Sequence, residues 1–201
     1  MTTDKNSKHK AIQQKLKESV DKGLAAATEL RGVCILLTGD GKGKSSSAFG
    51  MVMRSLGYGH KVGIVQFIKG EQLSGEEIYV KEKYPSLPFY QMGTGFTWET
   101  QDREADIKAA LATWAEAEKL LQNPAINLLV LDELTYMLAF DYLSEDIVIR
   151  AIKNRPVQQS VVITGRGGGS ALREIADTVS EIKNIKHAYD RGIKAQKGVD
   201  F

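Results

Sequence analysis

The chain has 201 residues, of which 42% are hydrophobic and 26% are charged. A chain of this length and composition can bury the core of one domain with appendages, which excludes a disordered protein. Because 27 Lys and Arg stand against 25 Asp and Glu, the formal net charge is only +2. We therefore expect neither nucleic acid nor an anionic membrane as a partner, and any anion must be bound locally.

The cysteine content and the N-terminal segment indicate the compartment. The single cysteine, Cys34, cannot form an internal disulfide, which is typical of a reducing cytoplasm. The N-terminal segment has no continuous apolar stretch that could serve as a signal peptide, and no run of about 18 apolar residues occurs anywhere. We expect a cytoplasmic protein.

Residues 1–31 are predicted to form a polar arm ahead of a domain over 32–201. Residues 1–10 are polar and basic, and we expect them to be mobile. After them, apolar residues recur every four positions and predict a helix that ends before Arg31 and Gly32: Ile12, Leu16, Val20 and Leu24. The stripe is narrow, so two interpretations stay open: a helix packed on its own domain, or an arm that covers a site on a partner subunit.

From residue 33 onward, short apolar runs alternate with amphipathic stretches. The apolar runs predict buried strands at 33–38, 61–69, 126–133 and 159–165, with weaker candidates at 88–93 and 178–182. Helical patterns lie between them, at 44–57, 71–83, 100–122, 144–153 and 169–176. This alternation predicts one α/β domain with a mainly parallel sheet, helices on both faces, and ligands at the carboxyl ends of the strands.

A glycine-rich segment, TGDGKGKSS, joins the first predicted strand to the following helix. Its glycines Gly39, Gly41 and Gly43 let backbone N–H groups turn toward an anion, and the helix adds its positive N-terminal end. Lys44 supplies a cation for phosphates, and Ser45 is placed to ligate Mg²⁺. The segment therefore predicts a nucleotide-binding loop.

This loop is one residue shorter than the usual GxxxxGK[ST] pattern, because Thr38 stands where the first glycine is expected. The shortening argues against the phosphate geometry of an ordinary hydrolase. The alternative is a glycine-rich turn with two exposed lysines, which three glycines and two lysines at one helix start disfavour.

Two further strand ends carry charged residues. The run INLLVLDE ends on Asp132 and Glu133, as expected of a strand that brings a carboxylate to a metal beside the phosphates. The run QSVVITGRGGG leads into a glycine-rich turn with Arg166. Arg166 is a candidate to hold phosphate oxygens in a bidentate manner, and the open alternative is an arginine that only satisfies the carbonyls at a helix C-terminus.

Together, TGDGKGKSS, GTGFTWET, LDELTYMLAFDYL, TGRG and the tail HAYDRGIKAQKGVDF resemble the ATP:corrinoid adenosyltransferase family over essentially the whole chain. The resemblance implies a P-loop NTPase-like, RecA-like fold and a transferase. In such an enzyme the Co(I) of a reduced corrinoid attacks the 5′ carbon of ATP and expels triphosphate, in adenosylcobalamin biosynthesis or salvage. That chemistry needs no protein nucleophile or general base, so the presence of only three histidines is no obstacle.

The resemblance also implies roles for individual residues. The phosphates would lie in the reverse sense from other P-loop enzymes, held by Gly41, Lys42, Gly43, Lys44, Ser45 and Ser46. Ser45 and Glu133, with Asp132 beside them, are the candidates for Mg²⁺ or Mn²⁺. Lys44 and Arg166 would stabilise charge on the leaving triphosphate. Arg54 is a candidate nucleotide contact, with a solvated helix charge as the open alternative.

Phe96 and Trp98 in GTGFTWET resemble the aromatic pair that sits under the corrin in this family and displaces its lower axial ligand. An apolar wall offers cobalt no donor and excludes water, which eases the reduction of Co(II). A lid on the core or an edge strand remains the alternative for this pair. The resemblance further implies a homodimer with exchanged N-terminal helices and a flavoprotein as reductant.

Two other classes of function compete with adenosyl transfer. A RecA-like ATPase should release orthophosphate and respond to DNA or a protein partner, which the short loop and the near-neutral charge disfavour. A regulatory module should bind ATP without turnover.

Overall fold

The computed structural model describes residues 2–68, 73–93, 102–167 and 169–201, with only the backbone for residues 2–5. The chain divides into two compact units, residues 1–30 and residues 31–201. In the described part of the chain, no helix combines the length and the apolar character needed to cross a membrane.

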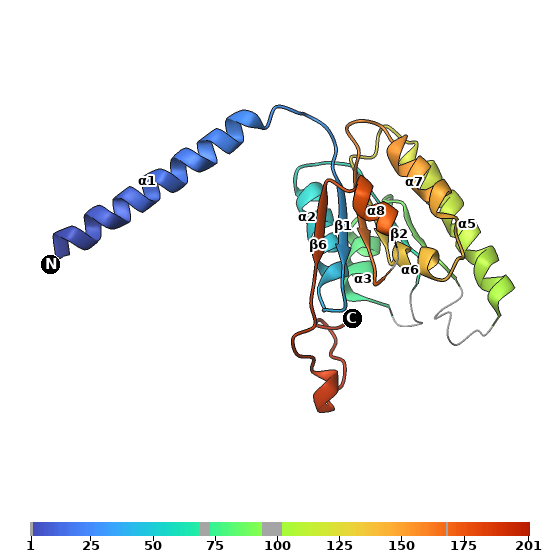
Figure 1. Cartoon of the computed structure of the whole chain (residues 1–201). Helices are drawn as coiled ribbons and strands as arrows, with labels where there is room; N and C mark the ends of the chain where they lie inside the picture. The colour runs from blue at the N-terminus through green and yellow to red at the C-terminus, as the bar shows by residue number, and fades with distance from the viewer. Residues whose placement is uncertain (1, 69–72, 94–101, 168) are drawn as a thin grey trace. The chain divides into compact units, whose positions relative to one another are not determined.

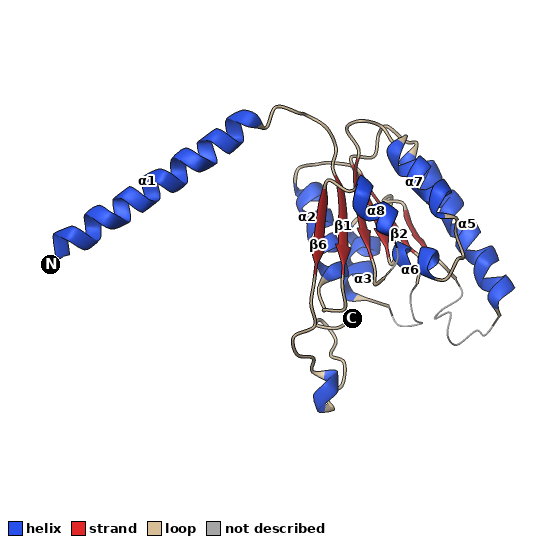
Figure 2. Ribbon diagram, in the orientation of Figure 1, coloured by secondary structure: helices blue, strands red, loops and turns tan. Residues whose placement is uncertain are grey.

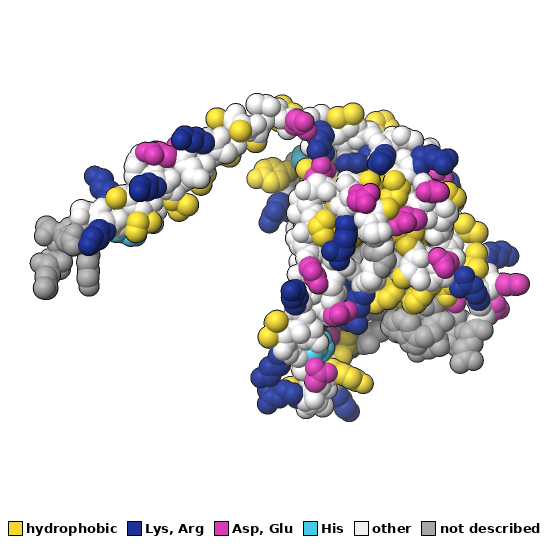
Figure 3. Space-filling view, viewed as in Figure 1, with side chains coloured by type: hydrophobic (Ala, Val, Ile, Leu, Met, Phe, Trp, Pro, Cys, Tyr) yellow, Lys and Arg dark blue, Asp and Glu magenta, His cyan; other side chains and the backbone are white. Residues whose placement is uncertain are grey.

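The first unit contains a single long helix, α1 (Thr2–Ala26). The expectation that residues 1–10 precede the helix was wrong, because the helix already begins at Thr2. Lys and Gln are good helix formers, so the helix extends beyond the apolar stripe that marks its middle. The stripe itself is exposed, with Ile12 at 64% and Leu24 at 68% of full exposure, and hydrophobic side chains are visible between the charged ones along α1 (Figure 3).

The second unit is built on a six-stranded sheet in the order β3-β2-β4-β5-β1-β6 (Figure 1). Every neighbouring pair of strands is parallel, which confirms the predicted sheet. The strands are β1 (Cys34–Thr38), β2 (Val62–Gln66), β3 (Phe89–Gln91), β4 (Leu128–Asp132), β5 (Ser160–Thr164) and β6 (Thr178–Glu181). All residues of β2 and β4 are buried, as expected for continuous apolar runs at the centre of a parallel sheet.

Helices cover both faces of this sheet (Figure 2). On one face lie α2 (Lys44–Gly57) and α3 (Gly75–Lys83), whose Phe49, Val52 and Val80 pack in one core cluster. The other cluster receives side chains from four further described α-helices: α5 (Arg103–Leu121), α6 (Leu134–Ala139), α7 (Glu145–Lys153) and α8 (Ser170–Ile175). A short 3₁₀-helix, η1 (Tyr189–Arg191), lies in the C-terminal segment.

Two of the described helices begin with a side-chain cap. Ser74 accepts a hydrogen bond from the backbone N–H of Glu77 at the start of α3, and Asp102 accepts one from that of Ala105 at the start of α5. The sequence did not predict α6, which follows β4 directly and has an apolar run without an amphipathic period.

The carboxyl ends of the four central strands meet at one edge of the sheet and carry buried polar side chains. Thr38 ends β1, Gln66 ends β2, Asp132 ends β4 and Thr164 ends β5, and none of the four is more than 5% exposed. Burying polar groups is unfavourable unless they are hydrogen-bonded, so this edge is where a polar site is expected.

Candidate active site

The glycine-rich segment forms the turn between β1 and α2. Gly43 has φ +122°, a conformation that side-chain-bearing residues rarely adopt, and this allows Lys44 to begin the helix directly. A Cβ on Gly39 would collide with the backbone of Ile182, and the N–H of Gly41 donates to the carbonyl of Ile182 over 2.7 Å. The segment after β6 therefore packs against the outer side of the loop. The loop's inner side lines a cavity.

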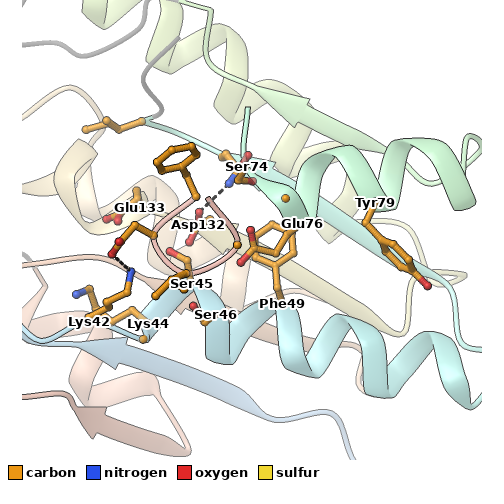
Figure 4. A pocket seen from close by; sticks show the side chains of 18 of the residues that line it. Lys42, Lys44, Ser45, Ser46, Phe49, Ser74, Glu76, Tyr79, Asp132 and Glu133 are labelled. Atoms are coloured by element: carbon orange, nitrogen blue, oxygen red, sulfur yellow. Dashed lines mark hydrogen bonds and ion pairs between the residues drawn. The ribbon is translucent and has the colours of Figure 1, made fainter. Parts of the chain in front are cut away.

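This cavity, of about 1150 Å³, lies between the loop, the strand ends and α3 (Figure 4). Its polar lining includes the predicted phosphate and metal residues: Gly41, Lys42, Gly43, Lys44, Ser45, Ser46, Asp132, Glu133 and Arg166. Its apolar lining comes from Phe49, Met53, Ile68, Tyr79, Val80, Val199 and Phe201. The unpaired N–H groups of the first turn of a helix face an anion in this kind of site.

Lys44 is the buried cation of the cavity. It is 6% exposed, and its Nζ donates to the carbonyl oxygen of Gly41 over 2.8 Å. Burial lowers the pKa of Lys44 from its ordinary value, while the charge of Glu133 acts in the opposite direction. A buried ammonium with one protein acceptor has further donors for an anionic ligand.

Asp132 is held by hydrogen bonds on both carboxylate oxygens. Oδ1 accepts from the hydroxyl of Thr164 over 2.6 Å, and Oδ2 accepts from Nε2 of Gln66 over 2.9 Å. The same Thr164 hydroxyl accepts from the backbone N–H of Glu133 over 2.9 Å. Asp132 is thus fixed by both neighbouring strands, and its orientation does not depend on a ligand.

Glu133 differs from Asp132 because part of its carboxylate has no protein partner. Its Oε2 is buried and makes no hydrogen bond. Its backbone is left-handed, with φ +59°, a conformation that costs a non-glycine residue about 1 to 3 kcal/mol. Burial, and then the charge of Asp132, raises the pKa of Glu133 to about 7. A strained residue of the cavity lining whose carboxylate has an unsatisfied oxygen is suited to bind a cation.

Ser45 and Ser46 lie in the first turn of α2 and line the same cavity as Glu133. Among the residues that the structure describes, no group of three His, Cys, Asp or Glu side chains could hold a metal ion by itself. A cation beside Ser45 and Glu133 would therefore take its other ligands from water and from phosphate oxygens, which is the usual arrangement for Mg²⁺.

The other predicted site residues fall into three groups. Arg166 is exposed and lines the cavity, so it is placed for a ligand contact. Arg54 is exposed in the last turn of α2 and is not among the residues that line the cavity, which favours the solvated helix charge. Phe96 and Trp98 lie outside the described residues.

The structure adds residues that sequence reasoning did not single out. Gln66 lines the cavity at the end of β2; the only signal for it was a lone amide in an otherwise apolar run. The C-terminal tail also reaches the cavity through its last residues, 198–201, and Nζ of Lys42 forms an ion pair with Oδ1 of Asp200 at 2.8 Å. In the sequence, the tail is informative only as part of the resemblance to a known family.

Comparison with known proteins relates the chain to one family. The family model "ATP:corrinoid adenosyltransferase BtuR/CobO/CobP" matches residues 30–201. The chain is 47% identical over 196 residues to the corrinoid adenosyltransferase CobA of Salmonella typhimurium, covering 98% of this chain and 99% of the relative. It is 50% identical over 198 residues to the corrinoid adenosyltransferase of Pseudomonas aeruginosa, covering 98% of each chain.

Proposed function

The chain belongs to the ATP:corrinoid adenosyltransferase family and is a corrinoid adenosyltransferase, and we propose that the cavity beside the glycine-rich loop is its active site. The enzyme transfers the 5′-deoxyadenosyl group of ATP to the cobalt of a Co(I) corrinoid, with release of triphosphate. The observation that carries the assignment of the site is the shared cavity of a glycine-rich loop, the buried Lys44 and the unpartnered oxygen of Glu133.

The triphosphate of ATP binds in this proposal along the loop and the first turn of α2. Lys44 and Lys42 offer positive charge, Gly43, Ser45 and Ser46 offer backbone N–H groups, and all of them line the cavity. A hydrogen bond to a charged group is worth about 1.5 to 3 kcal/mol. Lys42 must exchange its ion pair with Asp200 for the phosphates, whereas Lys44 needs no rearrangement because its ammonium already lies inside the cavity.

The transfer is a single displacement at the 5′ carbon. The lone pair of Co(I) forms the cobalt–carbon bond while the carbon–oxygen bond breaks, and its electron pair stays on the triphosphate. Negative charge therefore grows on the leaving oxygen in the transition state. Lys44 and Arg166 stabilise that charge electrostatically, and Lys44 is already held in place by its hydrogen bond to Gly41. No proton has to move in this step, so it needs no general base.

The donor set beside the loop fits a divalent cation. Glu133 Oε2 is anionic when deprotonated, buried and unpartnered, and Ser45 lies across the same cavity. We assign these two residues as the protein ligands. Asp132 shares the hydroxyl of Thr164 with the backbone N–H of Glu133 and so helps to position Glu133. Bound Mg²⁺ or Mn²⁺ would supply positive charge to the phosphate oxygens.

The corrinoid half of the site rests on the family membership. Phe96 and Trp98 form the wall under the corrin in this proposal and remove the lower ligand of cobalt. The exposed apolar stripe of α1 supports a homodimer in which each N-terminal helix covers the corrinoid of the other subunit, since four regularly spaced apolar side chains of one helix are otherwise exposed to water. A flavoprotein would supply the electron for Co(II).

An anaerobic spectral assay tests the proposed function. Protein, MgATP and a chemically reduced corrinoid are mixed, and we expect the Co(I) spectrum to convert into a light-sensitive alkyl-cobalt spectrum with one triphosphate released per corrinoid. Omitting ATP is the control. Release of orthophosphate without a change in the cobalt spectrum would instead identify an ATPase.

A further inference from the structure

A line of side-chain hydrogen bonds runs along the carboxyl edge of the sheet and ends on Asp132. Nε2 of Gln66 donates to Oδ2 of Asp132 over 2.9 Å. Oε1 of Gln66 accepts from Nε2 of Gln91 over 2.9 Å, and Oε1 of Gln91 accepts from Nζ of Lys81 over 3.3 Å. Lys81 is also paired with Glu77 over 2.7 Å. The line thus joins α3, β3, β2 and β4.

The chemistry of its two ends allows only one orientation of the line. A carboxylate accepts hydrogen bonds and cannot donate them, so the amide of Gln66 must turn its NH₂ toward Asp132. Its oxygen then faces Gln91 and needs a donor, which places the NH₂ of Gln91 there. The remaining oxygen of Gln91 meets the ammonium of Lys81, which can only donate. Each group in the line is therefore satisfied only when the amide of Gln66 points at Asp132.

Asp132 receives a second fixed donor from the opposite side. The hydroxyl of Thr164, on β5, donates to Oδ1 of Asp132 and accepts from the N–H of Glu133. Gln66 from β2 and Thr164 from β5 hold the Asp132 carboxylate between them. The hydroxyl of Thr164 also accepts a hydrogen bond from the backbone N–H of Glu133. The left-handed backbone of Glu133 depends on such support, because it is strained.

We propose that Gln66 is a positioning residue of the cation and phosphate site. It orients Glu133 indirectly, through Asp132 and Thr164. Gln91 and Lys81 in turn hold the amide of Gln66 in its orientation. The inference rests on the proposed role of Glu133 as the cation ligand. Gln66 is 5% exposed and lines the cavity, so a lost donor cannot be replaced freely by bulk water. Hydrogen-bond partners behind metal ligands typically change metal affinity or activity by about 10-fold to 100-fold when they are replaced.

The experiment compares Gln66→Met, which keeps the length of the side chain but removes the donor, with Gln66→Glu, which adds a negative charge that cannot donate to Asp132. Binding of Mn²⁺ to the full-length protein with ATP is followed by electron paramagnetic resonance. We expect Mn²⁺ binding to weaken about 10-fold in both variants, with KM for the corrinoid unchanged. Hydrogen exchange of the Glu133 amide in metal-free protein should become faster, which reports the positioning without turnover.

Two further variants serve as internal comparisons. Gln91→Met removes the donor behind Gln66 and should weaken Mn²⁺ binding in the same direction but less, and it keeps the test open if the Gln66 variants fail to fold. Lys83→Met is the matched surface control, because Lys83 lies on α3 near Lys81 but pairs with Glu82 instead of the line. It should leave Mn²⁺ binding unchanged.

The outcomes separate the inference from the proposed function on which it rests. If Glu133→Gln weakens Mn²⁺ binding while the folded Gln66 and Gln91 variants match the wild type, the positioning role is wrong and the cation site stands. If Glu133→Gln itself leaves Mn²⁺ binding unchanged, the cation site is wrong and the inference fails with it. An equal rise in KM for ATP and for the corrinoid would indicate general damage to packing and would overturn the positioning role.

Discussion

Replacing Glu133 by glutamine in the ligand-free enzyme removes a buried titrating carboxyl group and should change how the free energy of unfolding depends on pH. The pKa of Glu133 is raised from 4.5 to about 7, chiefly by burial and then by the charge of Asp132. Glutamine has nearly the same shape and cannot ionise, so the substitution isolates the titration from the packing.

The magnitude follows from the two pKa values. Below pH 4.5 the carboxyl is protonated in both the folded and the unfolded chain, and its stability contribution is fully present. Between pH 4.5 and about 7 the unfolded chain loses its proton while the folded chain keeps it, so stability falls as pH rises through this window. One pKa unit corresponds to about 1.4 kcal/mol, which gives a loss of at most about 3.5 kcal/mol above the window.

Denaturant unfolding of both proteins at about pH 4.5 and about pH 8, without Mg²⁺ or nucleotide, measures this loss. The wild type should lose more stability than Glu133→Gln between the two conditions, by up to about 3.5 kcal/mol, whereas other titrating groups cancel in the comparison. The exposed Glu174 offers a control, since Glu174→Gln should follow the wild type at both pH values. A difference between wild type and Glu133→Gln that stays constant with pH would refute the assignment of a strained, desolvated carboxyl at this position.

Four other substitutions test separate parts of the enzyme. Lys44→Ala should lower kcat/KM for ATP by at least about 10-fold, because it removes a charge-assisted contact of about 1.5 to 3 kcal/mol; normal ATP affinity by calorimetry would show that the loop is misassigned. Asp200→Asn should lower KM for ATP a few-fold in steady-state assays, since it frees Lys42 and removes a negative charge from the cavity, and an unchanged or higher KM would contradict this. Trp98→Ala should spare transfer to corrinoid supplied as Co(I) but slow transfer that starts from Co(II), and equal losses in the two assays would point to packing alone. Asp177→Asn removes the ion pair between Asp177 and Arg31, which is 2.6 Å long and partly exposed, and should destabilise the protein by about 1 kcal/mol or less in thermal unfolding near neutral pH. In the wild type the contribution of this pair should be lost as pH falls from 3.8 to about 2; a larger effect on turnover than on stability would be unexpected.

The binding loop and the carboxylate pair could be predicted because their signals are local. Glycines followed by lysine between an apolar strand and a helix place N–H groups and a cation together whatever the rest of the chain does. The same holds for Asp132 and Glu133, because the end of a buried strand in a parallel sheet lies at the ligand-binding edge. Arg54 shows the limit of local signals. Its position on the helix after the loop could be predicted from the sequence, but whether its side chain lines the cavity could not.

The start of α1 and the presence of α6 show the limits of periodicity. Periodicity reports burial of one face, so it underestimates a helix such as α1, whose N-terminal turns are polar all round. It also misses α6, which is too short and too uniformly apolar to show a polar face. In both cases the backbone is helical although the side-chain pattern that normally indicates a helix is absent.

By itself the sequence determined the class of fold, the phosphate loop and the family, because apolar runs, glycine spacing and strand ends are properties of short segments. Only the tertiary structure decided that β5 lies between β1 and β4, which brings Thr164 to Asp132 and Glu133. It also decided that Gln66 meets Asp132 and that Lys42 meets Asp200. These pairs are far apart in the chain, and their meeting depends on how two layers of helices pack against one sheet, which no local pattern encodes.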